Sequence, residues 1–212
     1  LALLRVPLAF AMGFVGYVGL GLLRGWPATA ASAAQVVYDS GFAYTLSVVP
    51  LFILMGNFVA RAGLANELFR AAYTFIGHVR GGLAMAAILS AAAFGAVCGS
   101  SVATSATITQ VAYPEMKAHG YHGRLSTGTL AVGGTLGILI PPSVPLVIYA
   151  VLTQESIGKL FVAAVIPGLI AMFGYMLVIR LVVTFNPTAG PAGDKAPWSQ
   201  RLESLVEVLP VV

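Results

Sequence analysis

The feature that most constrains this chain is a stretch of 33 residues, Gly81 to Tyr113, without a single charged side chain. It follows Arg80, precedes Glu115, and is interrupted near its middle by Gly99-Ser100-Ser101. A helix needs about 20 apolar residues to cross the hydrocarbon core of a bilayer. The stretch is therefore too long for one crossing and too short for two crossings joined by a turn.

The composition of the whole chain requires lipid as its main solvent. Of the 212 residues, 58% are hydrophobic and 8% are charged, whereas a soluble domain carries about 25% charged residues. The eleven lysines and arginines stand singly between apolar blocks, so they indicate membrane topology and not a nucleic-acid partner. Cys98 is the one cysteine and forms no internal disulfide. We therefore predict an all-α, multi-pass membrane protein.

The positive-inside rule indicates how the charge-free stretch is arranged. Four other windows are apolar enough to be spans: Val6–Leu23, Ser40–Ala60, Leu125–Gln154 and Leu160–Ile179. If the stretch 81–113 turns back as a re-entrant hairpin, nine Lys and Arg residues lie inside and two outside. If it crosses once, five lie inside and six outside, which is no bias. The count favours the hairpin.

Two amphipathic segments border this apolar framework. Between Gly63 and His78, apolar side chains recur at helical spacing, which predicts a helix along the cytoplasmic interface. Asn186–Pro197 is a polar linker, and Trp198 begins a second amphipathic helix that the end of the chain truncates. The chain begins without methionine and ends as an apolar stretch starts, so we expect it to be part of a longer protein.

The first group of candidate functional residues is the tip of the predicted hairpin, Gly95 to Ser105. Backbone that stops being helical at membrane depth needs protein, water or an ion as its partner. The Gly99-Ser100-Ser101 turn, with Thr104 after it, supplies carbonyl and hydroxyl oxygens suited to a small cation. The helix that follows points its positive N-terminal end at the same place, which favours a carboxylate. Small residues that only allow close helix packing are the alternative interpretation.

The second group lies inside the window Leu125–Gln154. Pro141, Pro142 and Pro145 lack amide hydrogens, so carbonyls near Gly137 and Ile138 lose their helical partners, and the helix must break. Each of the two breaks follows glycines four residues apart. Paired breaks are typical of the discontinuous helices that form transporter sites near the bilayer midplane. The alternative is a simple proline kink.

Other candidate chemistry is weaker. Ser100 with a distant histidine suggests an intramembrane serine hydrolase, but no GxSxG elbow is present, and His119 and His122 fall in an interfacial loop. A solvated loop is a better interpretation of these histidines than a metal pair. No Asp, Glu, Lys or Arg lies deep in a span, so the sequence favours an ion bound by neutral oxygens, such as sodium.

Seven runs in order along the chain resemble the large permease subunit of tripartite ATP-independent periplasmic (TRAP) transporters, over nearly the whole length. The runs are Val49–Gly56, Gly77–Ala84, Gly99–Thr104, Tyr113–Met116 with Gly120-Tyr121, Gly137–Ser143, Ser156–Phe161 and Ile166–Gly168. Cys98 departs from the small polar residue expected there. The match is to the N-terminal half of the subunit, so the second hairpin and second ion site are expected beyond Val212.

The resemblance implies a fold and a function. The fold is one half of an inverted-repeat helical bundle with a re-entrant hairpin and a discontinuous helix. The function is sodium-coupled, elevator-type import of organic acids, with a periplasmic binding protein and a small membrane subunit as partners, in the bacterial inner membrane. No cofactor besides the coupling sodium ion is implied. A single-polypeptide dicarboxylate or citrate carrier of the same superfamily and a purely structural membrane subunit are the alternatives.

The resemblance also assigns segments and residues. The site would combine the tip with the facing break: Gly99, Ser100, Ser101, Thr104, Gly137, Ile138, Pro141, Pro142 and Ser143. The sodium ion would lie at Ser100, Ser101, Gly137 and Pro141. The segments would be scaffold helices at 1–62, an interfacial arm at 63–80, the transport-domain half at 81–155 (hairpin 81–113, broken helix 125–154), a transmembrane helix at 156–185, and a linker with a truncated helix at 186–212. The sequence does not identify the substrate.

Overall fold

The computed structural model describes residues 6–42, 48–193 and 195–208, and within these ranges all regular structure is helical. The chain divides into two compact units, residues 1–47 and 48–212. Arg5, which the charge count includes, and Leu209, expected in the last helix, lie outside the described residues. The all-α prediction is confirmed.

The N-terminal unit is a pair of helices, α1 (Leu8–Arg24) and α2 (Trp26–Gly41), joined at Gly25. Gly25 has φ 86°, a conformation that glycine adopts without a Cβ penalty, and its carbonyl accepts a hydrogen bond from Thr29 Oγ1 at 2.9 Å. The span expected over 6–23 corresponds to α1. The helix α2 has no counterpart in the sequence prediction, and it takes in the first residues of the span expected over 40–60, whose residues 43–47 lie outside the described ranges.

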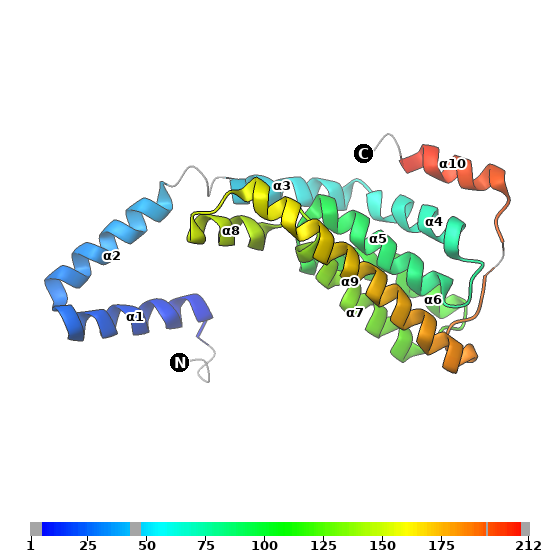
Figure 1. Cartoon of the computed structure of the whole chain (residues 1–212), viewed down its shortest axis with the longest axis horizontal. Helices are drawn as coiled ribbons and strands as arrows, with labels where there is room; N and C mark the ends of the chain where they lie inside the picture. The colour runs from blue at the N-terminus through cyan, green and yellow to red at the C-terminus, as the bar shows by residue number, and fades with distance from the viewer. Residues whose placement is uncertain (1–5, 43–47, 194, 209–212) are drawn as a thin grey trace. The chain divides into compact units, whose positions relative to one another are not determined.

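The second unit contains the remaining helices (Figure 1). They are α3 (Val48–Arg61), α4 (Leu64–Ile76), α5 (Gly82–Cys98), α6 (Ser101–Ala118), α7 (Gly123–Leu139), α8 (Val144–Thr153), α9 (Ile157–Phe185), a 3-10 turn (Pro187–Ala189) and α10 (Trp198–Val208). Among the described residues, α9 alone is long and apolar enough to cross a membrane unaided. Two bent pairs, α3 with α4 (63°) and α7 with α8 (41°), also qualify if each is one span.

Helix α5 forms the centre of this unit. It is apolar around its whole circumference, and most of its alanines are buried together with Leu83, Ile88 and Phe94. An all-round apolar helix of this kind is stable only when neighbours or lipid cover every face. Helices α4, α6, α7 and α9 pack on it, and Figure 1 shows α4 running alongside it. The helix expected over 63–80 is thus α4, which buries Ala65 and Phe69 in the same core.

The charge-free stretch is two helices, α5 and α6, that turn at Gly99-Ser100. Gly99 has φ 64°, and its N–H donates to the Gly95 carbonyl at 2.8 Å. Ser100 is extended and caps α6, with its Oγ accepting from the Ala103 N–H at 3.4 Å. Glycine and serine favour these two conformations, which is why the chain turns at this point.

Three segments distant in sequence meet at the other end of the hairpin. The Gly81 N–H donates to the Gly190 carbonyl at 3.0 Å, and the His122 N–H donates to the Ala189 carbonyl at 3.0 Å. The Tyr121 hydroxyl accepts from the Leu83 N–H at 3.1 Å and donates to the Pro191 carbonyl at 3.0 Å. Arg80, Lys117 and Arg124, which the charge count assigns to the cytoplasm, lie in or beside these loops, so we name this end the charged end.

Tyr121 offers a test of how firmly these segments are joined. Burial raises the pKa of its phenol, against the lowering effect of the Leu83 N–H, so the hydroxyl stays protonated and can donate. We expect Tyr121→Phe to lower the free energy of unfolding by about 1–3 kcal/mol, because it leaves the buried Leu83 N–H unpaired. Thermal melts should show the loss. Tyr149→Phe, an exposed tyrosine on α8, is the control and should melt as the wild type does.

Candidate functional site

The two chain breaks lie against each other. The helix expected over 125–154 is interrupted between Leu139 and Val144, where Ile140 is extended and the Pro141–Pro142 peptide is cis. The Val144 N–H points at the Gly99 carbonyl of the hairpin tip, 3.4 Å away. A Cβ atom added to Gly99 would lie 2.8 Å from the Pro142 carbonyl oxygen. The glycine-serine turn and the proline break therefore form one locus.

Glycines bring the helices on either side of this locus into backbone contact. A Cβ atom on Gly95 of α5 would lie 2.6 Å from the Gly137 Cα of α7, closer than real Cβ contacts allow. A Cβ atom on Gly137 would lie 2.5 Å from Thr104 Oγ1 and 2.9 Å from the Ser100 carbonyl oxygen. Oxygen atoms of Ser100 and Thr104 therefore pack directly against Gly137.

The locus lies about midway along the spanning helix α9. Gly168 of α9 faces Ile140 of the break, and a Cβ atom added to it would meet Ile140 Cγ1 at 2.9 Å. With a rise of 1.5 Å per residue, Gly168 is roughly 17 Å from the start of α9 and roughly 25 Å from its end. The charged end and the breaks are therefore separated by more than half of a helix that is long enough to cross a bilayer.

Two hydroxyl groups at the locus lack partners. The side chains of Thr104 and Ser143 are completely buried, and neither oxygen has a hydrogen bond within the part of the chain that the structure describes. The carbonyls of Gly137 and Ile138 also lack a helical donor, because the residue four positions later is in each case a proline, which carries no N–H. Buried polar groups are almost always paired, so orphaned oxygens indicate a missing water or ion.

The other residues that the sequence assigned to the site differ in how close they lie to these unpaired oxygens. Ser100 contributes its carbonyl on the side facing Gly137, while its hydroxyl is used as the cap of α6. Ser101 lines a groove beside the tip. Ile138, in the last turn of α7, and Pro141, within the break, are half-buried, and neither takes part in the bond between the break and the hairpin.

One contact at the locus has no counterpart in the sequence prediction. Gly56 of α3 lies against the hairpin tip, where a Cβ atom would meet the Cys98 carbonyl at 2.9 Å and the Cys98 Sγ at 3.1 Å. The available signal was a glycine in an otherwise large-residue apolar helix. Cys98 is small enough to permit this approach, which explains why a thiol is tolerated there.

A groove of about 600 Å³, lined by hydroxyl side chains among small apolar residues, opens between α6 and α7 next to the locus. Its lining includes Ser101, Ser105 and Thr109, which follow one another at single-turn spacing on α6, and Gln110 and Thr135. A hydroxyl-rich face is costly against lipid tails, so it indicates a water-filled or protein-covered surface.

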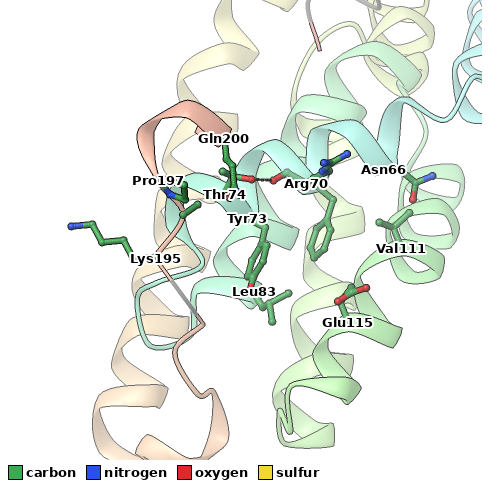
Figure 2. A pocket seen from close by; sticks show the side chains of 12 residues that line it. Asn66, Arg70, Tyr73, Thr74, Leu83, Val111, Glu115, Lys195, Pro197 and Gln200 are labelled. Carbon is green, nitrogen blue, oxygen red and sulfur yellow. Dashed lines mark hydrogen bonds between the residues drawn. The ribbon is translucent and has the colours of Figure 1, made fainter. Parts of the chain in front are cut away.

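Another cavity, of about 700 Å³, lies elsewhere, between α4, α6 and residues 195–200 (Figure 2). Leu83 and Glu115 line it, and both are near the charged end of the hairpin. Figure 2 shows Lys195 and Glu115 on opposite sides of it. Because it is remote from the paired breaks, we do not assign it to the same site.

Comparison with known proteins supplies the context for this geometry. The model of the family described as "Tripartite ATP-independent periplasmic transporter, DctM component" matches residues 1–212. The chain belongs to the DctM family of TRAP transporter large permeases. It is accordingly a membrane protein, and its family is one of permeases and not of enzymes, which removes the hydrolase alternative.

The names of curated relatives in the DctM family mention different substrates. The chain is 37% identical over 204 residues to a C4-dicarboxylate TRAP transporter large permease from Vibrio cholerae, covering 95% of this chain and 44% of that protein. It is 32% identical over 207 residues to an ectoine TRAP large permease from Halomonas elongata (97% and 48%), and 34% identical over 173 residues to a sialic acid TRAP large permease from Vibrio cholerae (82% and 40%). The chain spans less than half the length of these relatives and matches their N-terminal half.

Proposed function

We propose that this chain is the N-terminal half of a permease subunit that imports organic acids together with sodium ions, which enter down their own gradient. The observation that carries the proposal is the meeting of two helix breaks around the orphaned hydroxyls of Thr104 and Ser143. In the same proposal, a periplasmic binding protein delivers the acid, a small membrane subunit completes the assembly, and all of it resides in a bacterial inner membrane.

Neutral oxygens at the locus suit sodium. Hard cations prefer carbonyl, hydroxyl and water oxygens. The Ser100 carbonyl and Thr104 Oγ1 both lie beside Gly137, and the Gly137 carbonyl has no helical donor because Pro141 follows four residues on. Ser101 and Pro141, which the family resemblance also assigns to the ion, lie in the same two breaks. A bound cation would satisfy oxygens that otherwise stay unpaired in a medium without water.

The geometry supports a re-entrant hairpin. Both outer ends of the α5–α6 pair lie at the charged end, and its tip meets the break that lies midway along α9. A hairpin placed in this way enters and leaves on one side of the membrane, in agreement with the charge count of nine inside to two outside.

An acid substrate suits the surroundings of the tip. Helix α6 begins at Ser101, so its positive N-terminal end points at the locus and favours a carboxylate. The hydroxyl-lined groove between α6 and α7 adjoins it and has donors to offer. C4-dicarboxylate and sialic acid, named for two relatives, are both acids, and ectoine carries a carboxylate as well. Selection among such acids would rest with the binding protein and the second half.

An elevator motion fits the division of the chain. Helices α5, α6 and α7 pack on one another beside both breaks, and α4, which packs on α5, is joined to α3 through a 63° bend. Movement of α5, α6 and α7 against a fixed scaffold would carry the ion and the acid across together. Helix α4 would act as the arm between the two.

Sodium-dependent stabilisation tests the proposal directly. A ligand that binds the folded state alone raises its stability, by about 2.7 kcal/mol when present at 100 times its Kd. We expect the full-length permease, purified in detergent, to melt at a higher temperature in sodium chloride than in potassium chloride of equal concentration. Choline chloride controls for ionic strength. Identical melting curves in sodium and potassium would refute the sodium site.

A further inference from the structure

The most unusual buried group outside the proposed ion site is the guanidinium of Arg201 on α10. Its side chain is 8% exposed, yet Nε and Nη2 have no hydrogen-bond partner within the described residues. These two nitrogens form one edge of the guanidinium plane, and their N–H groups point in the same direction. That edge matches two oxygens of a carboxylate or a phosphate in bidentate geometry.

Among the side chains that the structure describes, none near Arg201 compensates its charge. The guanidinium carbon lies 5.9 Å from the ring centre of Phe75 on α4 and 5.1 Å from that of Trp198. Aromatic faces attract a cation weakly and leave its N–H groups free to donate. Glu67 has a buried carboxylate oxygen on the same helix as Phe75, but it lies about two turns away, roughly 12 Å, and no ion pair joins it to Arg201 among the described residues. A buried cation of this kind requires an anion.

An apolar groove begins at the same aromatic ring. It has a volume of about 250 Å³ and is lined by Leu68, Ala71, Ala72 and Phe75 of α4 with Leu89, Ser90 and Ala93 of α5. Phe75 is next to the end of α4 at the charged end, whereas Leu68 and Ala93 lie further toward the hairpin tip. The groove therefore leads from the guanidinium toward the depth of the helix bundle.

The outer surface of α10 is suited to a membrane. Trp198, Leu202 and Val206 are exposed and follow one another at single-turn spacing, whereas Arg201 and Ser204 are buried. Helix α10 packs on α4 (Figure 1). An exposed tryptophan at the head of an apolar stripe is typical of helices at the headgroup level of a bilayer.

We propose that Arg201 and the α4–α5 groove form a phospholipid site at the charged end of the permease. The guanidinium edge binds two oxygens of the lipid phosphate, and one acyl chain lies in the groove from Phe75 toward Leu68 and Ala93. A phosphate with a chain attached accounts for both the unpaired donors and the open apolar groove. A free anion accounts for the first alone.

Lipid titration of the delipidated full-length transporter tests this site. The probes are dioleoylphosphatidylglycerol, dioleoylglycerol, which has chains without a phosphate, and inorganic phosphate. Native mass spectrometry counts retained lipid, and the melting temperature reports binding. We expect the phospholipid to bind and stabilise the wild type. We expect Arg201→Gln to lower its affinity at least tenfold, and Arg201→Lys to lower it severalfold, because lysine keeps the charge and loses the bidentate edge.

Matched variants separate the two parts of the site. Ala93→Leu fills the groove and should lower phospholipid affinity with Arg201 intact, whereas Ala163→Leu on the exposed side of α9 should not. Arg180→Gln removes an exposed arginine near the end of α9 and should leave lipid binding unchanged. If Arg201→Gln does not fold, the comparison of phospholipid affinity between Ala93→Leu and Ala163→Leu still tests the site.

Several results would overturn the proposal. Equal phospholipid affinity in the wild type and Arg201→Gln would do so, as would inorganic phosphate alone matching the effect of the lipid. Failure of the wild type to bind the phospholipid would overturn it as well. None of these measurements depends on sodium, so they test the phospholipid site independently of the proposed transport mechanism.

Discussion

The Gly95→Ala variant is expected to lose sodium-driven uptake of its organic acid by at least tenfold. The added methyl group would sit 2.6 Å from the Gly137 Cα, and backbone cannot give way as the end of a flexible side chain can. The α5 helix must therefore separate from α7, which moves the hairpin tip away from the proline break. Overpacking of this kind costs about 1–3 kcal/mol in stability, and we expect a value near the upper limit.

Gly128→Ala is the matched control for this prediction. Gly128 is also a helical glycine, on α7, and a Cβ atom there would meet nothing within 4 Å. Alanine is favoured over glycine in a helix by about 1 kcal/mol, so this variant should melt at the same or a higher temperature. Uptake into proteoliposomes and thermal melts of both variants are the measurements. Normal uptake by Gly95→Ala would show that close approach of the two breaks is not needed.

The positions of both breaks can be predicted from the sequence because their causes are local. Glycine after α5 adopts a positive φ, serine caps α6, and Pro141 with Pro142 removes donors that α7 needs. Helix α9 is equally predictable, because its length of 29 residues and apolar composition leave few alternatives.

The helix α2 shows the limit of reasoning from apolar length. Trp26–Gly41 contains Gln35 and Asp39, so it does not stand out as a membrane span. Its signals were of another kind: Pro27 in the first turn and a run of alanines with high helix propensity. A search for spans alone passes over a helix that propensity would have found.

The sequence alone could not predict which hydroxyl oxygens at the candidate site are left unpaired. Ser100, Thr104 and Ser143 all carry hydroxyl groups, but backbone geometry decides which of them is used for capping. The Ser100 hydroxyl accepts a hydrogen bond from the Ala103 N–H, whereas the hydroxyls of Thr104 and Ser143 have no partner among the described residues. The contact of residues 189–193 with Tyr121 and its neighbouring loops could not be predicted from the sequence either, because such contacts depend on the whole fold.

Removal of the two unpaired hydroxyls is expected to separate stability from ion binding. Thr104→Val and Ser143→Ala each delete a buried oxygen that has no hydrogen bond in the described structure. Leaving such a group unpaired costs about 1–3 kcal/mol, so both variants should melt in potassium chloride at or above the wild-type temperature. Most core substitutions destabilise a protein, which makes this direction informative.

In sodium chloride the same variants should behave in the opposite way. An interaction with a charged group contributes about 1.5–3 kcal/mol, so loss of one ligand should raise the Kd for sodium about 10- to 100-fold. The sodium-dependent rise in melting temperature should shrink accordingly, and uptake should fall with it. Thr127→Val is the control, because that hydroxyl is exposed on α7 and donates to the Gly123 carbonyl. A full sodium shift in both Thr104→Val and Ser143→Ala would exclude these oxygens as ligands, whatever their effect on stability in potassium.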